Sequence, residues 1–247
     1  MTTPSCSEVN AHEDRAQLED ADRAERLASL RHSRIELAPR GAARKPSRLL
    51  IFLPGDGASA ASFSPVAMAW QLKFPGALGV ILQPPFQGKR WWEGKEIRTA
   101  ANRASRVVAQ LIQGLQADWQ LLPSQTAVVA IAQGATLALE LVRSRASEAV
   151  PCAIVVAYAA RLSAPIRVHE RVGCTVHLIH GDLDHRIPYV YGEHAYRSLK
   201  AAGADVTWDL LANAAHTIGQ EGLNRGTLRA MQSIFRGRNR STPLTLH

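Results

Sequence analysis

Two residues in the last third of the chain have the types and the spacing needed for proton transfer. Asp184 closely follows the apolar run 174–180, and His216 lies in the short loop after the next such run, 206–211. Both runs have the length and composition of buried strands, so each side chain would lie just beyond a strand end. An aspartate that orients a histidine, in this chain order, is typical of the general-base half of an acyl-transfer site. Either residue alone is more often an ordinary turn or surface residue.

The nucleophile of such a site is missing from the position where it is expected. Within residues 126–141, β-prone apolar residues give way at Gln133-Gly134 to an Ala- and Leu-rich helical stretch. A strand that breaks at a glycine and continues as a helix is typical of a nucleophile elbow, in which Gly-x-Ser-x-Gly exposes a serine hydroxyl. Here the five residues are Ala130-Ile-Ala-Gln-Gly134, so Ala132 occupies the serine position. The pattern predicts the turn without the hydroxyl.

A second glycine turn could supply hydrogen-bond donors to the same site. The apolar run 48–54 is followed by Gly55-Asp-Gly-Ala-Ser-Ala60. This segment fits the dinucleotide pattern G-x-G-x-x-A, which also requires an acidic residue about 20 positions later to hold the ribose. No Asp or Glu lies between Asp56 and Glu93, which argues against a nicotinamide, and no cofactor is expected. The alternative is an oxyanion hole built from a backbone N–H of this turn.

Trp91 and Trp92 stand together in a glycine-flanked loop, residues 88–93. A tryptophan pair most often packs into a core, which is the simpler interpretation. Exposed paired tryptophans are uncommon without a ligand or partner, so the functional interpretation is one wall of an acyl or alkyl pocket. We therefore treat both as candidate substrate-binding residues.

The run His180-Gly-Asp-Leu-Asp-His185 holds four possible metal ligands within six residues. A two-metal hydrolase site also needs carboxylates and imidazoles from other loops, which a single run does not supply. A His-Gly pair that ends a strand, with one carboxylate just beyond it, fits the run better. No metal is expected.

Apolar runs of strand length alternate along the chain with stretches of helical periodicity. This alternation predicts an α/β fold with a mostly parallel, doubly wound sheet and helices on both faces. Ligands bind such sheets at the carboxyl ends of the strands, where Gly55, Ala132 and Asp184 are expected. Besides the elbow strand and helix, the predicted strands are residues 48–54, 78–82, 152–158, 174–180 and 206–211, and the predicted helices are residues 64–72, 97–115, 192–202 and 219–236.

Three segments are expected. Residues 1–46 are rich in Glu, Asp, Arg and Ala with few apolar side chains, which indicates a flexible charged arm ending in a Pro/Gly/Arg linker. Residues 47–236 would form one domain, since 46% of the chain is hydrophobic and its length suits a single core. Residues 237–247 would form a basic tail.

A net charge of +8 and a pI near 9.9 raise the question of an anionic partner. The cationic residues cluster in the flanks, around Arg44 and Arg238, without interleaved aromatics or a nucleic-acid-binding module. Solvated charge is therefore the favoured interpretation, and nucleic acid binding is not expected.

Cysteine usage and hydropathy indicate the compartment. The three cysteines are widely spaced, with no Cys-x-x-Cys pair, which argues against a disulfide framework or a thiolate zinc site and favours the cytoplasm. No export signal or membrane span is expected, because no basic segment leads into an apolar one and no 18 uncharged apolar residues run together. The sequence does not indicate an oligomeric state.

Several local motifs together resemble the carboxylesterase/phospholipase branch of the α/β-hydrolases, which includes acyl-protein thioesterases. The resemblance covers roughly residues 47–236, and no single motif is as specific as their combination. The matching segments are Leu53-Pro-Gly-Asp-Gly57 for Leu-His-Gly-x-Gly, Trp91-Trp-Glu93 for a Trp-aromatic-acid loop, Ala130-Ile-Ala-Gln-Gly-Ala135 for Gly-Phe-Ser-Gln-Gly-Ala, His180-Gly-Asp-Leu-Asp184 for His-Gly-x-x-Asp, and Ala215-His-Thr-Ile218 for Gly-His-x-Ile.

The resemblance implies an α/β-hydrolase fold and a role for each matched residue. Asp184 would orient His216 as the general base, and the N–H groups of Asp56 and Gln133 would form the oxyanion hole. The ligand would be a small acyl ester or thioester. Two departures matter: Pro54 replaces a histidine in the first turn, and Ala132 replaces the serine that forms the acyl-enzyme.

Three interpretations of Ala132 remain open. The chain could bind acyl ligands without turning them over, which requires only the missing hydroxyl. The alanine could be an introduced substitution, since Ser-to-Ala is the usual way to trap a substrate. A hydrolase could persist if Asp184 and His216 activate water, or if Ser62 or Ser64 substitutes, although capping is the commoner role for serines at a helix start. From another class, a basic scaffold protein would fit the charge.

Overall fold

The computed structural model describes residues 25, 29, 33–40, 45–94, 96–144, 149–167 and 170–241. The predicted N-terminal arm therefore lies largely outside the described residues. Among the helices described, none combines the length and the apolar character that crossing a bilayer requires.

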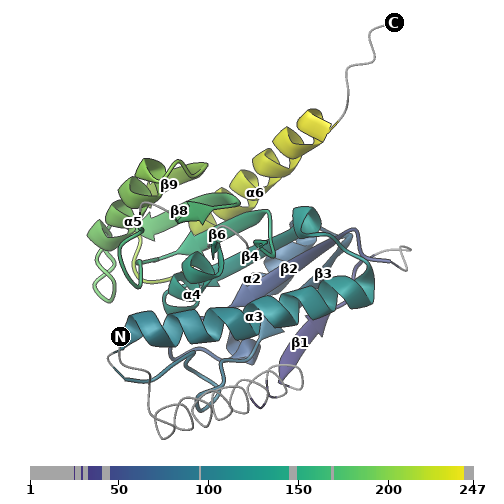
Figure 1. The fold of residues 1–247 in the computed structure, drawn as a ribbon, viewed down its shortest axis with the longest axis horizontal. Helices are drawn as coiled ribbons and strands as arrows, with labels where there is room; N and C mark the ends of the chain where they lie inside the picture. Colours follow the sequence, from purple (N-terminus) through teal and green to yellow (C-terminus); the bar gives the residue numbers. More distant parts are fainter. Residues whose placement is uncertain are drawn as a thin grey trace, which may run out of the picture.

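A seven-stranded sheet forms the centre of the described structure, in the order β1-β3-β2-β4-β6-β8-β9 (Figure 1). Every neighbouring pair is parallel except β1 with β3. The predicted mostly parallel α/β sheet is thus confirmed. The strands are β1 Arg34–Leu37, β2 Arg48–Leu53, β3 Ala77–Leu82, β4 Thr126–Ile131, β6 Ile154–Tyr158, β8 Thr175–Gly181 and β9 Val206–Leu211.

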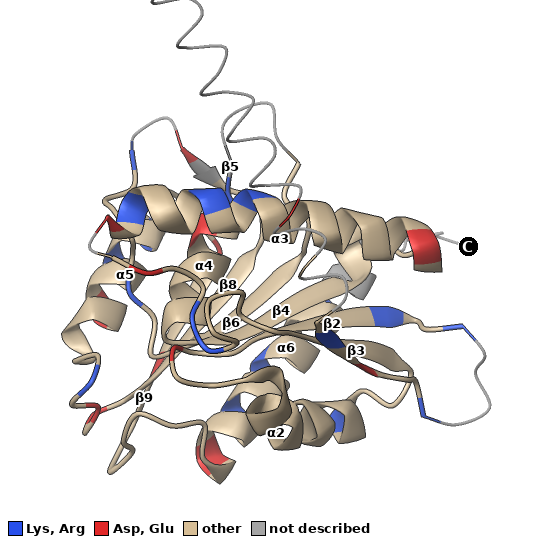
Figure 2. Ribbon diagram, turned by 90° about the horizontal axis from the view of Figure 1, so that it is seen from below, with Lys and Arg blue, Asp and Glu red and all other residues tan. Residues whose placement is uncertain are grey.

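Helices cover both faces of the sheet. In Figure 2, α3, α4 and α5 lie on one side of the sheet and α2 and α6 on the other. Helix α2 starts four residues before the predicted residue 64, because Ser59 caps it and forms a reciprocal capping box with Ser62. The helices are α2 Ala60–Lys73, α3 Ile97–Trp119, α4 Gln133–Leu141, α5 Val190–Ala201 and α6 Gln220–Ser241.

Strand β2 shows how the two layers share one sheet. Leu49, Ile51 and Leu53 pack with the layer of α3, α4 and α5, whereas Leu50 and Phe52 pack with the layer of α2 and α6. Side chains alternate between the faces of a strand, so a continuous apolar run is required when both faces are covered. Burying each such side chain contributes about 1.5–3 kcal/mol to stability.

Helix α3 shows the opposite pattern, with one face in the core and one in solvent. Val107, Val108 and Leu111 are among its buried residues. Its charged residues are exposed, with three arginines in its first half and a single acidic residue near its end (Figure 2). This amphipathic periodicity made the helix predictable from sequence. The charged residues are Arg98, Arg103, Arg106 and Asp118.

Strand β1 corrects the predicted extent of the arm. Residues 34–37 were assigned to the flexible arm, but they pair antiparallel with β3, from Arg34 opposite Leu82 to Leu37 opposite Gly79. Ile35 and Leu37 pack against the core, while Arg34 pairs with Glu36 at 2.7 Å. A strand at the edge of a sheet tolerates this charge because one of its sides faces solvent. At the other end, α6 continues to Ser241, five residues into the predicted tail.

His177 is a buried polar residue of the β8 core. It is fully buried, and its Nδ1 and Nε2 lie 2.8 Å from Thr207 Oγ1 and 2.9 Å from Ser233 Oγ. Burial, followed by the nearby positive charge of Arg229, lowers the pKa of His177 to about 4. The ring is therefore neutral in the folded state over the physiological range.

This buried ring predicts a loss of stability in mild acid. An unfolded histidine takes up a proton near pH 6.5, whereas folded His177 does so only near pH 4, so stability falls as the pH drops through that window. Between pH 7 and pH 5 the loss amounts to about 2 kcal/mol. In urea unfolding, the free energy of unfolding of His177→Gln should fall less between pH 7 and pH 5 than that of the unmodified chain. His194→Gln, at an exposed site on α5, should show the same fall as the unmodified chain. An unchanged dependence of the free energy of unfolding on pH in His177→Gln would contradict this assignment.

Candidate active site

Ala132 stands at a sharp turn between β4 and α4. Its φ of 53° and ψ of −115° lie in a region that L-residues rarely adopt and that costs about 1–3 kcal/mol. Two backbone hydrogen bonds hold the turn: the Ala132 N–H donates to Tyr158 O at 3.0 Å, and Thr136 N–H donates to Ala132 O at 2.9 Å. The predicted elbow is therefore present in the structure, with a methyl group where the hydroxyl would be.

Gly134 allows α4 to start directly against the end of β2. A Cβ atom at this position would lie 2.3 Å from Leu53 O and 2.6 Å from Pro54 O, both backbone atoms. Real Cβ atoms are not found at such distances, so any larger residue would push α4 away from the sheet. The glycine of the elbow pattern thus has a steric cause here.

Gly181 has the equivalent role at the end of β8. A Cβ atom there would lie 2.1 Å from Ala214 O in the loop that follows β9. Three hydrogen bonds join the two loops: Asp182 N–H to Leu211 O, Leu183 N–H to Ala214 O, and Ala214 N–H to Asp182 Oδ1, at 3.0, 3.0 and 3.2 Å. This close backbone contact brings the loop of Asp184 beside the loop of His216.

Asp184 is a buried carboxylate with several donors. Its Oδ1 accepts from the N–H groups of Arg186 and Ile187 at 2.9 and 2.8 Å, and its Oδ2 lies 2.7 Å from His216 Nδ1. Burial alone would raise the pKa of Asp184, but the hydrogen bonds from Ile187, His216 and Arg186 outweigh it and lower this pKa. The group is therefore ionised at neutral pH.

An ionised Asp184 fixes the tautomer of His216. Since a carboxylate only accepts, Nδ1 carries a proton, and in the neutral tautomer that this favours Nε2 is the acceptor. The His216 side chain is 12% exposed and lines two clefts, one of which Ala132 also lines. The structure thus brings Ala132, Asp184 and His216 together at one end of the sheet, in the arrangement of a nucleophile position, an orienting acid and a base.

The two proposed oxyanion donors lie next to this group. Gln133 is the first residue of α4, so its N–H is one of the amides that a helix leaves without an intrahelical partner. Asp56 lies in the turn after β2. Asp56 and Gln133 both line the second of the two clefts, the one that His216 lines without Ala132. Two N–H groups beside a nucleophile position are what an oxyanion hole requires.

Two clefts meet at Asp56, Arg186 and His216. The first, which we call the apolar cleft, has a volume of about 210 Å³ and also contains Ala132. The second, the polar cleft, has a volume of about 170 Å³. Besides the shared residues, the apolar cleft is lined by Phe63, Val66, Ile131 and Ile218 among others, and the polar cleft by Trp92, Gln133, Thr136, Arg161 and Ile187.

The structure separates the two tryptophans. Trp91 is 1% exposed, its indole N–H donates to Pro54 O at 2.7 Å, and it lines neither cleft. Trp91 is therefore a packing residue, which corrects its assignment to a pocket wall. Trp92 lines the polar cleft. The Gln133 side chain holds both, accepting from Trp91 N–H at 2.7 Å and donating to Trp92 O at 3.1 Å. Sequence reasoning missed this bond, because 41 residues separate its partners.

Four of the other candidate residues have structural partners. His180 Nε2 lies 2.8 Å from Ile187 O, and Asp182 binds the backbone of Ala214. Within the described residues, no three His, Cys, Asp or Glu side chains are arranged to hold a metal. Ser62 belongs to the capping box of α2, and Ser64 donates to Ala60 O at 3.2 Å, so both serines have helix contacts.

Comparison with known proteins decides the family. The profile of the phospholipase/carboxylesterase family matches residues 40–226. The chain belongs to this family. Its relatives include the esterase YpfH of Escherichia coli K12, which is 28% identical over 186 residues, or 70% of this chain and 78% of that protein.

Solved structures support the same α/β-hydrolase fold for this family member. The crystal structure of esterase PE8 matches with a TM-score of 0.72 and 24% identity, over 81% of this chain and 98% of that one. The Bacillus cereus carboxylesterase matches with a TM-score of 0.66 and 14% identity, over 81% and 93% of the two chains. At these identities the likeness concerns the fold.

The close approach at Gly134 predicts a large steric effect. Gly134→Ala should lower the free energy of unfolding by about 3 kcal/mol, because backbone oxygens cannot yield to the added methyl group. For a domain of this size, the melting temperature should fall by about 6–12 °C. Gly219→Ala is the matched control, since a Cβ atom there would meet nothing within 4 Å. Equal melting temperatures for the two variants would refute the steric argument.

Proposed function

We propose that this chain binds small acyl esters or thioesters at Ala132 and, as it stands, turns them over at no more than a trace rate. The contact between His216 Nδ1 and Asp184 Oδ2, at 2.7 Å, carries the proposal. It orients a base toward clefts beside a nucleophile position that has only a methyl group. The esterase YpfH, a relative by sequence, supports ester chemistry for the lineage.

The missing hydroxyl affects the chemical step far more than binding. A serine ester hydrolase forms an acyl-enzyme through its hydroxyl, and Ala132 has no group that could attack the carbonyl. Losing the nucleophile of a serine protease lowers turnover about 10⁶-fold, and the remaining rate comes from the oxyanion hole and binding. The clefts and N–H groups of the present site do not depend on the hydroxyl.

Restoring the serine is the direct test. Ala132→Ser should give labelling by fluorophosphonates at position 132 and measurable hydrolysis of p-nitrophenyl acetate or butyrate, whereas the unmodified chain should show no acyl-enzyme burst. The contact of His216 with Asp184, and the presence of Asp56 and Gln133 in the same cleft as His216, support this expected gain. Adding His216→Ala to Ala132→Ser should abolish the gain, since the serine then has no base.

Two results would contradict the proposal in different ways. A folded but unlabelled Ala132→Ser chain would mean that the site has lost more than its nucleophile. Brisk turnover by the unmodified chain would mean that His216 and Asp184 activate water or that another residue attacks; loss of this turnover in His216→Ala, with no acyl-enzyme formed by the unmodified chain, would identify the water mechanism.

Trp92 should contribute to ligand affinity. It is 5% exposed and lines the polar cleft, so Trp92→Ala should weaken binding of a short-chain ester to the unmodified chain by about tenfold, measured by calorimetry. Gln133→Ala tests the same contact indirectly, because it removes the side chain that binds Trp92 O. Equal affinity in all three proteins would assign Trp92 to packing.

A further inference from the structure

The polar cleft contains one arginine, Arg161, whose positive charge is not neutralised by any residue that the structure describes. Arg161 and Arg186 both line this cleft. Arg186 Nη2 lies 3.2 Å from Asp56 Oδ2, so these two charges offset each other. Arg161 is half-buried, and among the described residues no hydrogen bond or ion pair involves its side chain. Among the described residues, the cleft therefore has an unbalanced positive charge close to His216.

The other polar groups of this cleft are largely occupied. The Gln133 amide binds the backbone of Trp91 and Trp92, and the Thr136 hydroxyl donates to Ala132 O. Of the polar side chains that line the cleft, the Arg161 guanidinium thus has the most unused donors. A guanidinium presents five N–H groups in a planar fork that matches carboxylate and phosphate oxygens.

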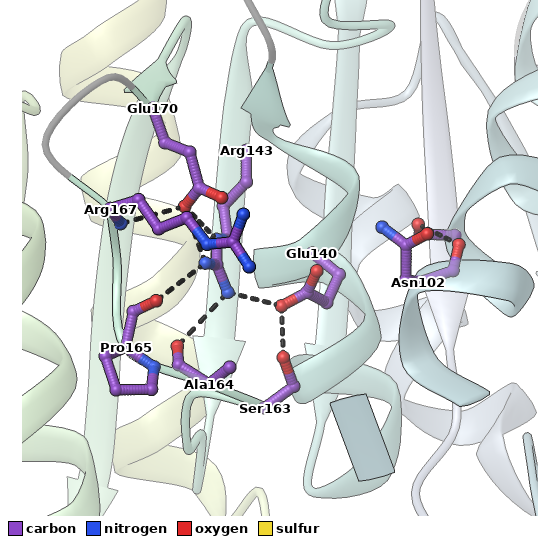
Figure 3. Close-up of polar contacts among 9 residues, drawn as sticks. Asn102, Glu140, Arg143, Ser163, Ala164, Pro165, Arg167 and Glu170 are labelled. Carbon is purple, nitrogen blue, oxygen red and sulfur yellow. Dashed lines mark hydrogen bonds and ion pairs between the residues drawn. The ribbon is translucent and has the colours of Figure 1, made fainter. Parts of the chain in front are cut away.

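The loop that carries Arg161 is fixed by a buried ion cluster. Arg143, two residues beyond the end of α4, donates to Glu140 and to Glu170, each at 2.6 Å (Figure 3). It also donates to Ala164 O and Pro165 O at 3.2 and 2.9 Å, directly on the loop. The side chains of Arg143, Glu140 and Glu170 are only 8%, 7% and 14% exposed.

Further contacts hold the loop on the Arg161 side. The Ser163 hydroxyl donates to Glu140, which ties the loop to α4 two residues beyond Arg161. On the other side, Ala159 takes a φ of 48° and its N–H donates to Ile179 O at 3.0 Å. A buried cluster of this kind is weak evidence for net stability, but it restricts the geometry of whatever it joins. Here it restricts the backbone on either side of Arg161.

The two clefts therefore offer different chemistry on the two sides of one reactive position. Phe63, Val66 and Ile218 give the apolar cleft a hydrocarbon surface. Arg161 gives the polar cleft a cation on a backbone that the Arg143 cluster holds in place. We propose that the ligand is an ester with a carboxylate or phosphate group, bound by Arg161 in the polar cleft, and with a hydrocarbon group in the apolar cleft. This inference rests on the proposed function, because it names the substrate class of the same site.

Binding to the unmodified chain tests the inference without catalysis. One pair of ligands is monobutyl succinate and its neutral methyl ester, with the anion on the acyl part. The other pair is hexanoylglycerol 3-phosphate and monohexanoylglycerol, with the anion on the alcohol part. In calorimetry at low salt, the anion of at least one pair should bind about tenfold or more tightly than its neutral partner, as expected for a charged hydrogen bond. The pair that shows the preference distinguishes a carboxylate on the acyl part from a phosphate on the alcohol part.

Variants assign that preference to Arg161. Arg161→Gln should bring the two members of the preferred pair within about twofold of each other and leave the affinity for the neutral member unchanged. Arg106→Gln, at an exposed site on α3 that lines neither cleft, should keep the preference and so controls for net charge. Ser163→Ala removes one anchor of the loop and should reduce the preference partially.

Each result has a stated meaning. Equal affinities within both pairs, or no binding of any ligand, would overturn the inference. Loss of both neutral and anionic binding in Arg161→Gln would also overturn it, because Arg161 would then support the fold of the cleft. An Arg161-dependent preference supports it. If that preference occurs while Ala132→Ser stays unlabelled, the anion site stands and the proposed ester function fails, so the two proposals fail separately.

Discussion

The site depends on two places where only a glycine fits between backbone segments. At Gly134 the start of α4 lies against the carbonyl oxygens that end β2, and at Gly181 the end of β8 lies against the loop that follows β9. The first contact places Ala132 at its strained turn beside the turn of Asp56. The second brings Asp184 within 2.7 Å of His216. Because both contacts are between backbones, they hold whichever side chain occupies position 132.

This constraint explains how an elbow can persist without its hydroxyl. The unusual φ of Ala132 costs free energy, yet Gly134 and the hydrogen bonds to Tyr158 and Thr136 fix the backbone on both sides of it. Gln133 adds a link of its own, since its amide holds the backbone of Trp91 and Trp92. The geometry of the site is thus a property of the fold, and under the proposed function the chemistry would depend on one oxygen atom.

Local patterns predicted the strands, the elbow and the Asp–His pair, and they did so for a physical reason. Strand ends of a parallel sheet meet at one edge, so Asp184 and His216 could be placed together from chain order alone. Contacts between distant segments leave no such pattern: the bond from Gln133 to Trp92 and the cluster around Arg143 span 41 and 27 residues. Strand β1 was missed because an edge strand needs few apolar residues. The sequence could not distinguish the roles of Trp91 and Trp92, because their hydrogen-bond partners lie far away in the chain.

Without a nucleophile, the residues proposed to stabilise the transition state and those proposed to bind the intact ester would contribute unequally to affinity. The proposed oxyanion donors at Asp56 and Gln133 would be complementary to a charge that develops only during acyl transfer, so they would add little to the affinity for an intact ester. In the proposed complex, Arg161 and Trp92 would contact parts of the ligand that do not react, and their full contribution would appear in the dissociation constant. In an Ala132→Ser chain, the free energy of the same contacts would be divided between effects on KM and effects on kcat. Under this proposal the alanine form would report ground-state recognition directly, and the serine form would report what the nucleophile and the oxyanion donors add together.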